Sequence, residues 1–160
     1  MAKLHEQLKQ RWPEDVIELH DFRGDETAVI RRESLLRIAD FIKRDPGFDM
    51  NVLTDLTAVD GLALKTQPRF EVVYHFYSLP KNHRLRIKVP VEEGDAMVPS
   101  LTRIWPAADW FEREVWDMFG IRFEGHPNLK RILMYDEFTG HPLRKDYPYN
   151  KRQPLVGPKK

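Results

Sequence analysis

The sequence predicts an α+β domain, in which helices pack on an antiparallel or mixed sheet, followed by a long extended C-terminal arm. Three observations predict this fold. Apolar and polar residues alternate between residues 70 and 89, apolar stripes with helical spacing occur at 35–42 and 108–119, and prolines recur after residue 120. We therefore divide the chain into an α+β domain over residues 1–119 and a Pro-rich basic arm over residues 120–160.

The first part of the chain contains short helices and short strands. Apolar residues at helical spacing end at Pro13 in the first helix and at Asp45-Pro46-Gly47 in the second. Segments rich in Val, Ile, Leu and Thr favour strands. The predicted elements are a helix at 4–12, strands at 16–20 and 27–30, a helix at 35–42 and a strand at 52–59.

The clearest predicted element is a β-hairpin formed by residues 70–77 and 85–89. Apolar residues recur at every second position in both strands, which is the period of a sheet with one buried face. The other face of the second strand is basic, with Arg84, Arg86 and Lys88. This face should point to solvent. An alternative function is a nucleic-acid-binding module, in which these three side chains and the basic arm contact the phosphates.

Helices are also predicted at 99–101 and 106–119, each with a proline suited to its first turn. Projection at about 100° per residue gives the second helix two faces. The predicted core face comprises Ala108, Phe111, Val115, Met118 and Phe119. The predicted outer face comprises Trp110, Arg113, Glu114 and Asp117.

Trp110 is the unexpected residue of this outer face. Arg113 can stack on Trp110 and pair with Asp117, but each exposed contact contributes only about 0.2–1 kcal/mol. Burial of a large apolar side chain is worth roughly 2 kcal/mol or more. We therefore expect either the arm or a partner to cover this face.

The acidic residues of the helix favour a structural role. Glu112, Glu114 and Asp117 are interleaved with Arg113 and point to different sectors of the helix. No histidine lies beside them at helical spacing. Ion pairing is therefore a better interpretation than acid/base catalysis or metal binding.

Two Phe-x-Gly-His-Pro repeats place His126 and His141 fifteen residues apart. This spacing matches no metal-ligand pattern, so we expect both histidines to donate hydrogen bonds to carboxylates or carbonyls. The sequence contains no Gly-rich phosphate loop and no nucleophile elbow. We predict no catalytic, cofactor-binding or metal-binding residue.

Composition and charge exclude further kinds of site. The 160 residues include no cysteine, which excludes disulfides, thiolate catalysis and iron–sulfur ligation through thiolates. No apolar run has the length of a membrane span, and the N-terminus does not resemble a signal peptide. From residue 141 onward, six Lys or Arg and one Asp give +5, so the rest of the chain carries −4 of the total +1. A basic arm and an acidic body predict that the arm lies on an acidic surface.

The region from residue 52 to 148 resembles the C subunit of the proton-translocating NADH–quinone oxidoreductase, respiratory complex I, the 30 kDa subunit family. The resemblance rests on Glu-Arg-Glu at 112–114, Asp-Met-Phe at 117–119 and the run Gly-His-Pro-Leu-Arg-Lys-Asp-Tyr-Pro at 140–148. The signature residues and the neighbours expected at an interface are Trp110, Glu112, Arg113, Glu114, Asp117, His126, Lys130, Arg131, His141, Arg144, Lys145, Asp146 and Tyr147.

The resemblance implies a cofactor-free structural subunit of the hydrophilic arm of that complex, which transfers electrons from NADH to quinone and translocates protons. It implies that the subunit packs against the D subunit, which holds the quinone site, and lies near the B subunit, with FMN and iron–sulfur clusters in partner subunits. The C-terminal arm is expected to pack on partner subunits. It also implies a peripheral position on the cytoplasmic side of the inner (plasma) membrane, with membrane association only through the complex.

Three alternatives stay open. Related membrane-bound hydrogenases and ferredoxin-linked complexes use a similar subunit, so the electron donor is not fixed by the resemblance. The nucleic-acid-binding module is the alternative from another class. An independent enzyme ranks third, because no active site is apparent.

Overall fold

The computed structural model describes residues 3–154. Its helices and strands in chain order are α1 (Leu4–Arg11), β1 (Val16–Phe22), β2 (Asp25–Ile30), α2 (Leu35–Arg44), β3 (Val52–Asp60), β4 (Phe70–Ser78), β5 (His83–Val91), β6 (Met97–Pro99), α3 (Ala108–Phe119) and β7 (Arg122–Glu124). Short 3-10 helices are η1 (Arg32–Ser34), η2 (Leu62–Leu64) and η3 (Glu93–Asp95). Of the predicted arm, residues 125–154 have no helix or strand and residues 155–160 lie outside the described residues.

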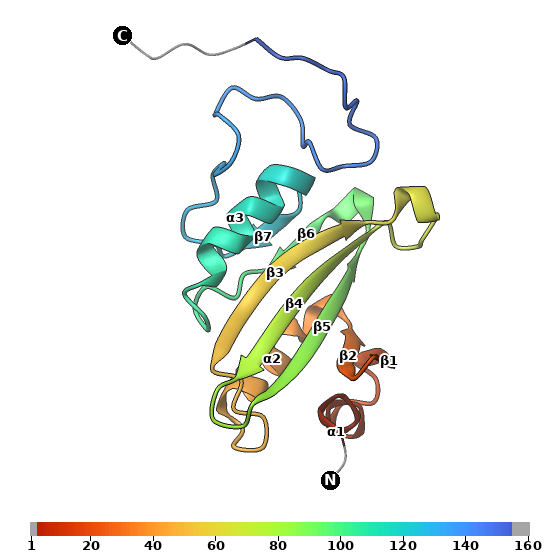
Figure 1. Ribbon diagram of the computed structural model, residues 1–160, viewed down its shortest axis with the longest axis vertical. Coiled ribbons are helices and arrows are strands. Elements are labelled where there is room, and N and C mark those ends of the chain that lie inside the picture. Colours follow the sequence, from red (N-terminus) through yellow and green to blue (C-terminus); the bar gives the residue numbers. More distant parts are fainter. Residues whose placement is uncertain (1–2, 155–160) are drawn as a thin grey trace.

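Within residues 3–154, five strands form one sheet in the order β1-β2-β5-β4-β3 (Figure 1). The predicted hairpin is present, with β4 and β5 antiparallel from Phe70 opposite Val91 to Ser78 opposite His83. β2 runs parallel to β5, so the sheet is mixed. The predicted α+β class is therefore confirmed.

One face of the sheet is covered by helices. Tyr74 and Phe76 of β4 and Ile87 of β5 are almost fully buried in the same apolar cluster as residues of α1, α2 and α3. The Phe76 ring lies 4.8 Å from the Trp105 ring, just before α3. α3 lies along the β3 edge of the sheet, and the chain after β7 continues over the end of that helix (Figure 1). The core thus places α3 where it can support the arm.

The helix predicted at residues 99–101 is wrong. Residues 97–99 form β6, which pairs in parallel with β7, and the Ser100 N–H donates to the Glu124 carbonyl at 2.9 Å. Pro99 is accommodated because it is the last residue of a short strand, where no ladder donor is required. α3 connects the two strands, so β6, α3 and β7 form one small unit beside the main sheet.

Tyr74→Phe should leave the free energy of unfolding unchanged or raise it by about 1 kcal/mol. The Tyr74 hydroxyl is fully buried and has no hydrogen-bond partner among the described residues, so its removal eliminates an unsatisfied polar group. Tyr77→Phe is the matched control, because the Tyr77 hydroxyl donates to Asn82 at 2.6 Å. Urea denaturation of both variants checks this, and a large loss for Tyr74→Phe alone would contradict it.

Candidate functional site

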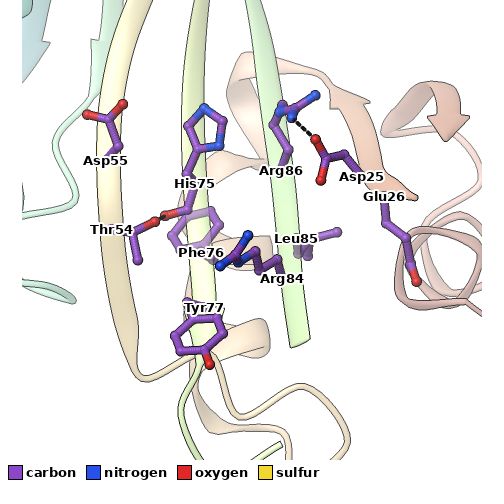
Figure 2. Close-up of a pocket in the computed structure, with 10 residues that line it drawn as sticks. All are labelled: Asp25, Glu26, Thr54, Asp55, His75, Phe76, Tyr77, Arg84, Leu85 and Arg86. Carbon is purple, nitrogen blue, oxygen red and sulfur yellow. Dashed lines mark hydrogen bonds and ion pairs between the residues drawn. The ribbon is translucent and has the colours of Figure 1, made fainter. Parts of the chain in front are cut away.

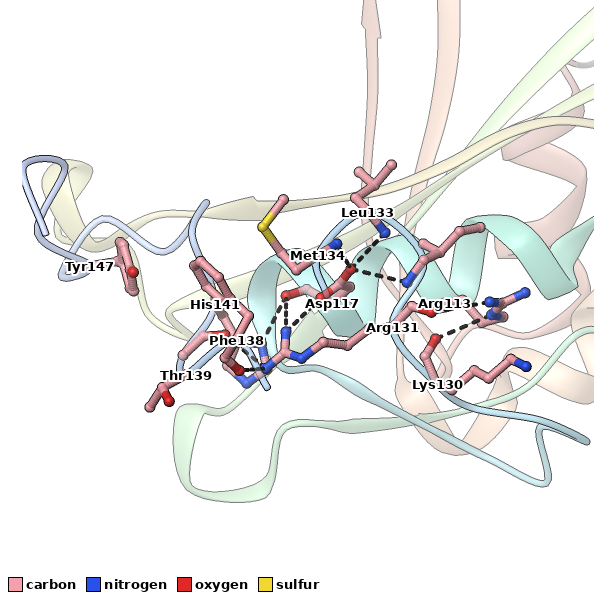
Figure 3. Close-up of polar contacts among 12 residues, drawn as sticks. Arg113, Asp117, Lys130, Arg131, Leu133, Met134, Phe138, Thr139, His141 and Tyr147 are labelled. Carbon is pink, nitrogen blue, oxygen red and sulfur yellow. Dashed lines mark hydrogen bonds and ion pairs between the residues drawn. The ribbon is translucent and has the colours of Figure 1, made fainter. Parts of the chain in front are cut away.

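Asp117, near the end of α3, anchors the arm through backbone hydrogen bonds. Its side chain is fully buried, and Oδ2 accepts the N–H groups of Ile132, Leu133 and Met134 at 3.1, 2.8 and 2.8 Å (Figure 3). Oδ1 accepts Arg131 Nη1 at 2.5 Å. Burial alone would raise the pKa of Asp117, but these hydrogen bonds outweigh it and lower the pKa below its ordinary value. Asp117 lies on the face that the arm or a partner was expected to cover, and in the structure the arm covers this part of the helix.

Arg131 connects Asp117 to the next part of the arm. Its Nη2 donates to the carbonyls of Phe138 and Gly140 at 2.8 and 3.1 Å. The His141 Nδ1 donates to the Asp117 carbonyl at 3.0 Å. The predicted role of His141, hydrogen bonding to a carbonyl, is present in the structure.

α3 ends at a glycine because the arm crosses there. Gly120 has φ +80°, the left-handed conformation that terminates many helices. A Cβ at this position would lie 2.7 Å from Cδ2 of His141. A side chain at residue 120 would therefore both strain the backbone and displace the arm.

Arg113 contacts the arm and not Asp117. It donates to the Lys130 and Arg131 carbonyls at 3.2 and 3.1 Å, so the predicted Arg113–Asp117 pair is wrong and Arg131 takes that place. The predicted stacking is present, with the Arg113 guanidinium 5.5 Å from the Trp110 ring centroid. Trp110 is still 66% exposed, so the arm within this chain leaves most of it uncovered.

A second group of charges holds the arm at residues 145–146. Arg69, 7% exposed, donates to both carboxylate oxygens of Asp60 at 2.9 and 2.7 Å, to Glu93 at 2.6 Å and to Asp146 at 3.1 Å. Asp60 also accepts the backbone N–H of Lys145 at 2.8 Å. We call Asp60, Arg69, Glu93 and Asp146 the Arg69 cluster. It joins the end of β3 to residues 145–146 of the arm.

Arg144 and Tyr147 extend this contact. Arg144 donates to Glu93 at 2.5 Å and to Asp146 at 3.3 Å. The Tyr147 ring lies 6.0 Å from the Phe138 ring. The basic arm therefore does lie on acidic side chains of the body.

Stability should fall as the pH falls from about 4 to 2, with the arm contacts weakening first. The Arg69 guanidinium holds the pKa of Asp60 well below its usual range and lowers that of Asp146 to about 2. A carboxyl group with a lowered folded-state pKa stabilises the protein above its ordinary pKa and loses that contribution as pH falls through the folded-state value. Protease cleavage between residues 140 and 147, followed against pH, would test this, and unchanged cleavage down to pH 2 would contradict it.

Glu112 is buried in a place that sequence reasoning missed. Its side chain is fully buried and accepts the Ser100 hydroxyl at 2.6 Å and the Leu101 N–H at 2.7 Å. Burial raises its pKa to about 7. The predicted ion pairing is therefore wrong for Glu112, while Glu114 is exposed. The available signal was its position within the apolar stripe, four residues after Ala108 and three before Val115.

His126 also contacts backbone groups. Its ring is buried, its Nδ1 accepts the Asn128 N–H at 3.0 Å, and its Nε2 donates to the Asp109 carbonyl at 3.1 Å. Over residues 3–154 there is no group of three or more His, Cys, Asp or Glu side chains arranged to hold a metal ion. The two histidines thus act as hydrogen-bonding supports for the arm.

The basic face of β5 is largely neutralised by acidic neighbours. Arg86 pairs with Asp25 at 2.9 Å, and Lys88 pairs with Glu71 at 2.8 Å. A hollow of about 650 Å³ lies on the open face of the sheet. Its lining includes Arg86, Asp25, His75 and Arg84 (Figure 2). Burial, followed by the charge of Arg86, lowers the pKa of His75. This balanced surface does not favour the nucleic-acid alternative, which needs a concentrated positive charge.

Comparison with known proteins covers almost the whole chain. The family described as "Respiratory-chain NADH dehydrogenase, 30 Kd subunit" matches residues 28–153. The chain is 43% identical over 152 residues to the NADH-quinone oxidoreductase C subunit of Geotalea uraniireducens (strain Rf4), which covers 94% of this chain and 90% of the relative. It is 46% identical over 147 residues to the C subunit of Roseiflexus sp. (strain RS-1), covering 92% and 83%.

Two solved structures have a similar fold. A structure described as Nqo5 of the trypsin-resistant fragment (1-134) has a TM-score of 0.70 and 33% identity, covering 80% of this chain and 100% of that one. A chain of the membrane-bound sulfane sulfur reductase, an archaeal respiratory membrane complex, has a TM-score of 0.72 at 24% identity, covering 91% and 84%. None of the helices within residues 3–154 is long and apolar enough to cross a membrane. From these matches, the chain belongs to the 30 kDa subunit family of the respiratory-chain NADH dehydrogenase, as the C subunit of NADH–quinone oxidoreductase.

Proposed function

We propose that this chain is a non-catalytic, cofactor-free assembly subunit in the hydrophilic arm of NADH–quinone oxidoreductase. In this role it packs against the quinone-site D subunit and lies near the B subunit. FMN and the iron–sulfur clusters belong to partner subunits, and the chain contacts the membrane only through the complex. Its location is peripheral, on the cytoplasmic side of the inner (plasma) membrane.

The exposed apolar side chains on α3 and the arm carry this proposal. Trp110 is 66% exposed, Leu133 57% and Leu143 50%. They stand on a backbone that Asp117 and the Arg69 cluster hold against the body. A fixed surface with exposed Trp and a stacked Arg has the composition of an interface hot spot. A partner subunit that covers Trp110 is therefore the best explanation for leaving it in water.

The chemistry available to the chain supports a structural role. The absence of cysteine removes the usual ligands of iron–sulfur clusters. The charged signature residues Asp117 and Arg131 are paired with each other and with arm backbone groups, and Asp146 is paired with Arg69. These residues position the arm and so have no free group to offer a substrate.

The proposal extends to the arm as a whole. Residues 120–160 are proposed to pack on partner subunits, beyond the contacts that residues 130–147 make with the body. Lys151 and Arg152 are exposed and available to an acidic partner. Lys159 and Lys160 lie outside the described residues.

Trp110→Ala should lower the yield of assembled complex by roughly tenfold or more, since loss of a hot-spot side chain costs about 2 kcal/mol or more. The isolated chain should keep its stability within about 0.5 kcal/mol, because an exposed side chain is removed. The measurement is co-purification of the tagged chain with iron–sulfur subunits from detergent-solubilised membranes, with NADH–quinone activity expressed per assembled complex. That activity should be little affected.

Phe22→Ala is the matched control. Phe22 is 65% exposed, at the end of β1 and away from the arm, so its removal should leave assembly unchanged. Equal assembly of wild type, Trp110→Ala and Phe22→Ala would argue against this interface. Normal assembly with lost quinone reduction in Trp110→Ala would instead place α3 near the chemistry. If hydrogenase subunits co-purify with the wild-type chain, the complex would be a membrane-bound hydrogenase and NADH would not be its electron donor.

A further inference from the structure

Glu112 is a buried acid that the proposed interface does not use. Its two carboxylate oxygens face the Leu101 N–H at 2.7 Å and the Ser100 hydroxyl at 2.6 Å. Among the described residues no Lys or Arg pairs with it, and its basic neighbour is His126, whose Nε2 is 4.0 Å away. Both side chains are fully buried. The two donors favour the ionised carboxylate, but burial without a cation outweighs them and favours the protonated form.

The hydrogen bonds of His126 use one ring nitrogen as an acceptor and the other as a donor. Its Nδ1 accepts the Asn128 N–H at 3.0 Å, and therefore its hydrogen is on Nε2, which donates to the Asp109 carbonyl at 3.1 Å. A second proton on Nδ1 would break the hydrogen bond from Asn128. The contacts of the ring therefore leave Glu112 without a counterion.

The other groups that face Glu112 also favour its neutral form. Asp109, one turn earlier on α3, repels the ionised carboxylate. Tyr74 on β4 is fully buried, and a charge on Glu112 would raise its pKa further. Ser100 contacts the Thr102 hydroxyl at 2.8 Å. A proton on Glu112 can donate to Ser100, and Ser100 can then donate to Thr102, while Leu101 keeps its bond to the other carboxyl oxygen.

We propose that Glu112 is a proton-binding site whose occupancy is linked to the position of His126. When Glu112 loses its proton, the carboxylate attracts the Nε2–H of His126 away from the Asp109 carbonyl. His126 lies in the turn that directly follows β7, near the start of the arm. Proton binding at Glu112 is thus transmitted to the start of the arm. This link is a property of the single chain and does not depend on any partner.

Burial raises the pKa of Glu112 to about 7, so Glu112 loses its proton near neutral pH. A carboxyl group with a raised folded-state pKa binds more protons in the folded chain than in the unfolded one between its ordinary pKa and about 7. Folded-state stability therefore decreases across this range as the pH rises. The sign is opposite to that of Asp60 and Asp146.

The test is NMR spectroscopy of the full chain between pH 5 and 9. We expect the Glu112 carboxyl ¹³C resonance to titrate with a midpoint near 7, and the His126 ring ¹⁵N resonances to shift with the same midpoint. Glu112→Gln keeps partners for both Leu101 and Ser100 but cannot ionise, so it should abolish the His126 shift. Glu114→Gln, a change of the same kind at an exposed position of α3, should leave the Glu112 titration and the His126 resonance shift as in wild type.

Two results would overturn the proposal. One is titration of Glu112 in the ordinary carboxyl range near 4, and the other is a His126 shift that persists in Glu112→Gln. If Glu112→Gln does not fold, the wild-type spectra decide the matter. Coincident midpoints for Glu112 and His126 support the link, and separate midpoints refute it.

Discussion

Asp117→Ala is expected to lower the free energy of unfolding by about 3–5 kcal/mol, because it leaves the Arg131 guanidinium without its partner in a largely buried position. It also removes the acceptor of the Ile132, Leu133 and Met134 N–H groups. Residues 130–141 should then detach from α3 while the sheet core stays folded. Urea denaturation measures the stability, and limited trypsin digestion measures the detachment.

Two further variants separate the contributions at Asp117. Asp117→Asn retains an acceptor for the backbone N–H groups and loses the charge, so its effect should be intermediate. Glu114→Ala changes an exposed acid of the same helix and should alter stability by less than about 0.5 kcal/mol. If Asp117→Ala were as stable and as resistant to trypsin as Glu114→Ala, the arm would not be held by Asp117.

Arg69→Ala should have an effect of similar size, roughly 3–5 kcal/mol, because Asp60 is fully buried and would lose its cation. Detachment should begin at residues 144–147, which follow the segment 130–141 that Asp117→Ala affects. The loss of stability near pH 2–4 should also become smaller, since Arg69 is the main cause of the lowered pKa of Asp60 and Asp146. Denaturation at pH 7 and at pH 3 tests both statements.

Arg69→Lys and Arg84→Ala are the controls for this cluster. Lysine preserves the charge but cannot contact both Asp60 oxygens and Asp146 with a planar fork, so it should recover only part of the stability. Arg84 is exposed and stacks 5.6 Å from the Tyr77 ring, so Arg84→Ala should cost less than about 1 kcal/mol. Full recovery by lysine would show that charge alone, without geometry, holds the arm.

The sequence was sufficient to predict the sheet and the helices but not every short element. The alternation between residues 70 and 89 corresponds directly to β4 and β5, since a strand with one buried face must repeat every two residues. The apolar stripe at 35–42 likewise corresponds to α2. Residues 97–99 and 122–124 were missed because strands of three residues are too short to establish a period.

The residues of α3 and of the arm in the candidate site were predicted, but Asp60, Arg69 and Glu93 of the Arg69 cluster were not, and neither was the geometry. Trp110 was expected to face outward and does. The same helical projection placed Asp117 on this face, which the arm or a partner was expected to cover, but it could not identify which residues of the arm contact the carboxylate. Its partners include backbone N–H groups, which nearly every residue carries, so no side-chain pattern marks them. Glu93 contacts Arg69 only because the fold brings these two distant residues together.

The hydrogen bond from Lys145 to Asp60 joins residues 85 positions apart and has a consequence for biosynthesis. A contact between residues so far apart in sequence closes a large loop. The chain loses conformational entropy when this loop closes, before the contact contributes any stability. Synthesis runs from the N-terminus, so β3, the Asp60 carboxylate and α3 are complete before the arm has been translated. Docking of the arm is then the last step within the nascent chain. A partner subunit that arrives earlier would compete with the arm for Asp60 and Asp117.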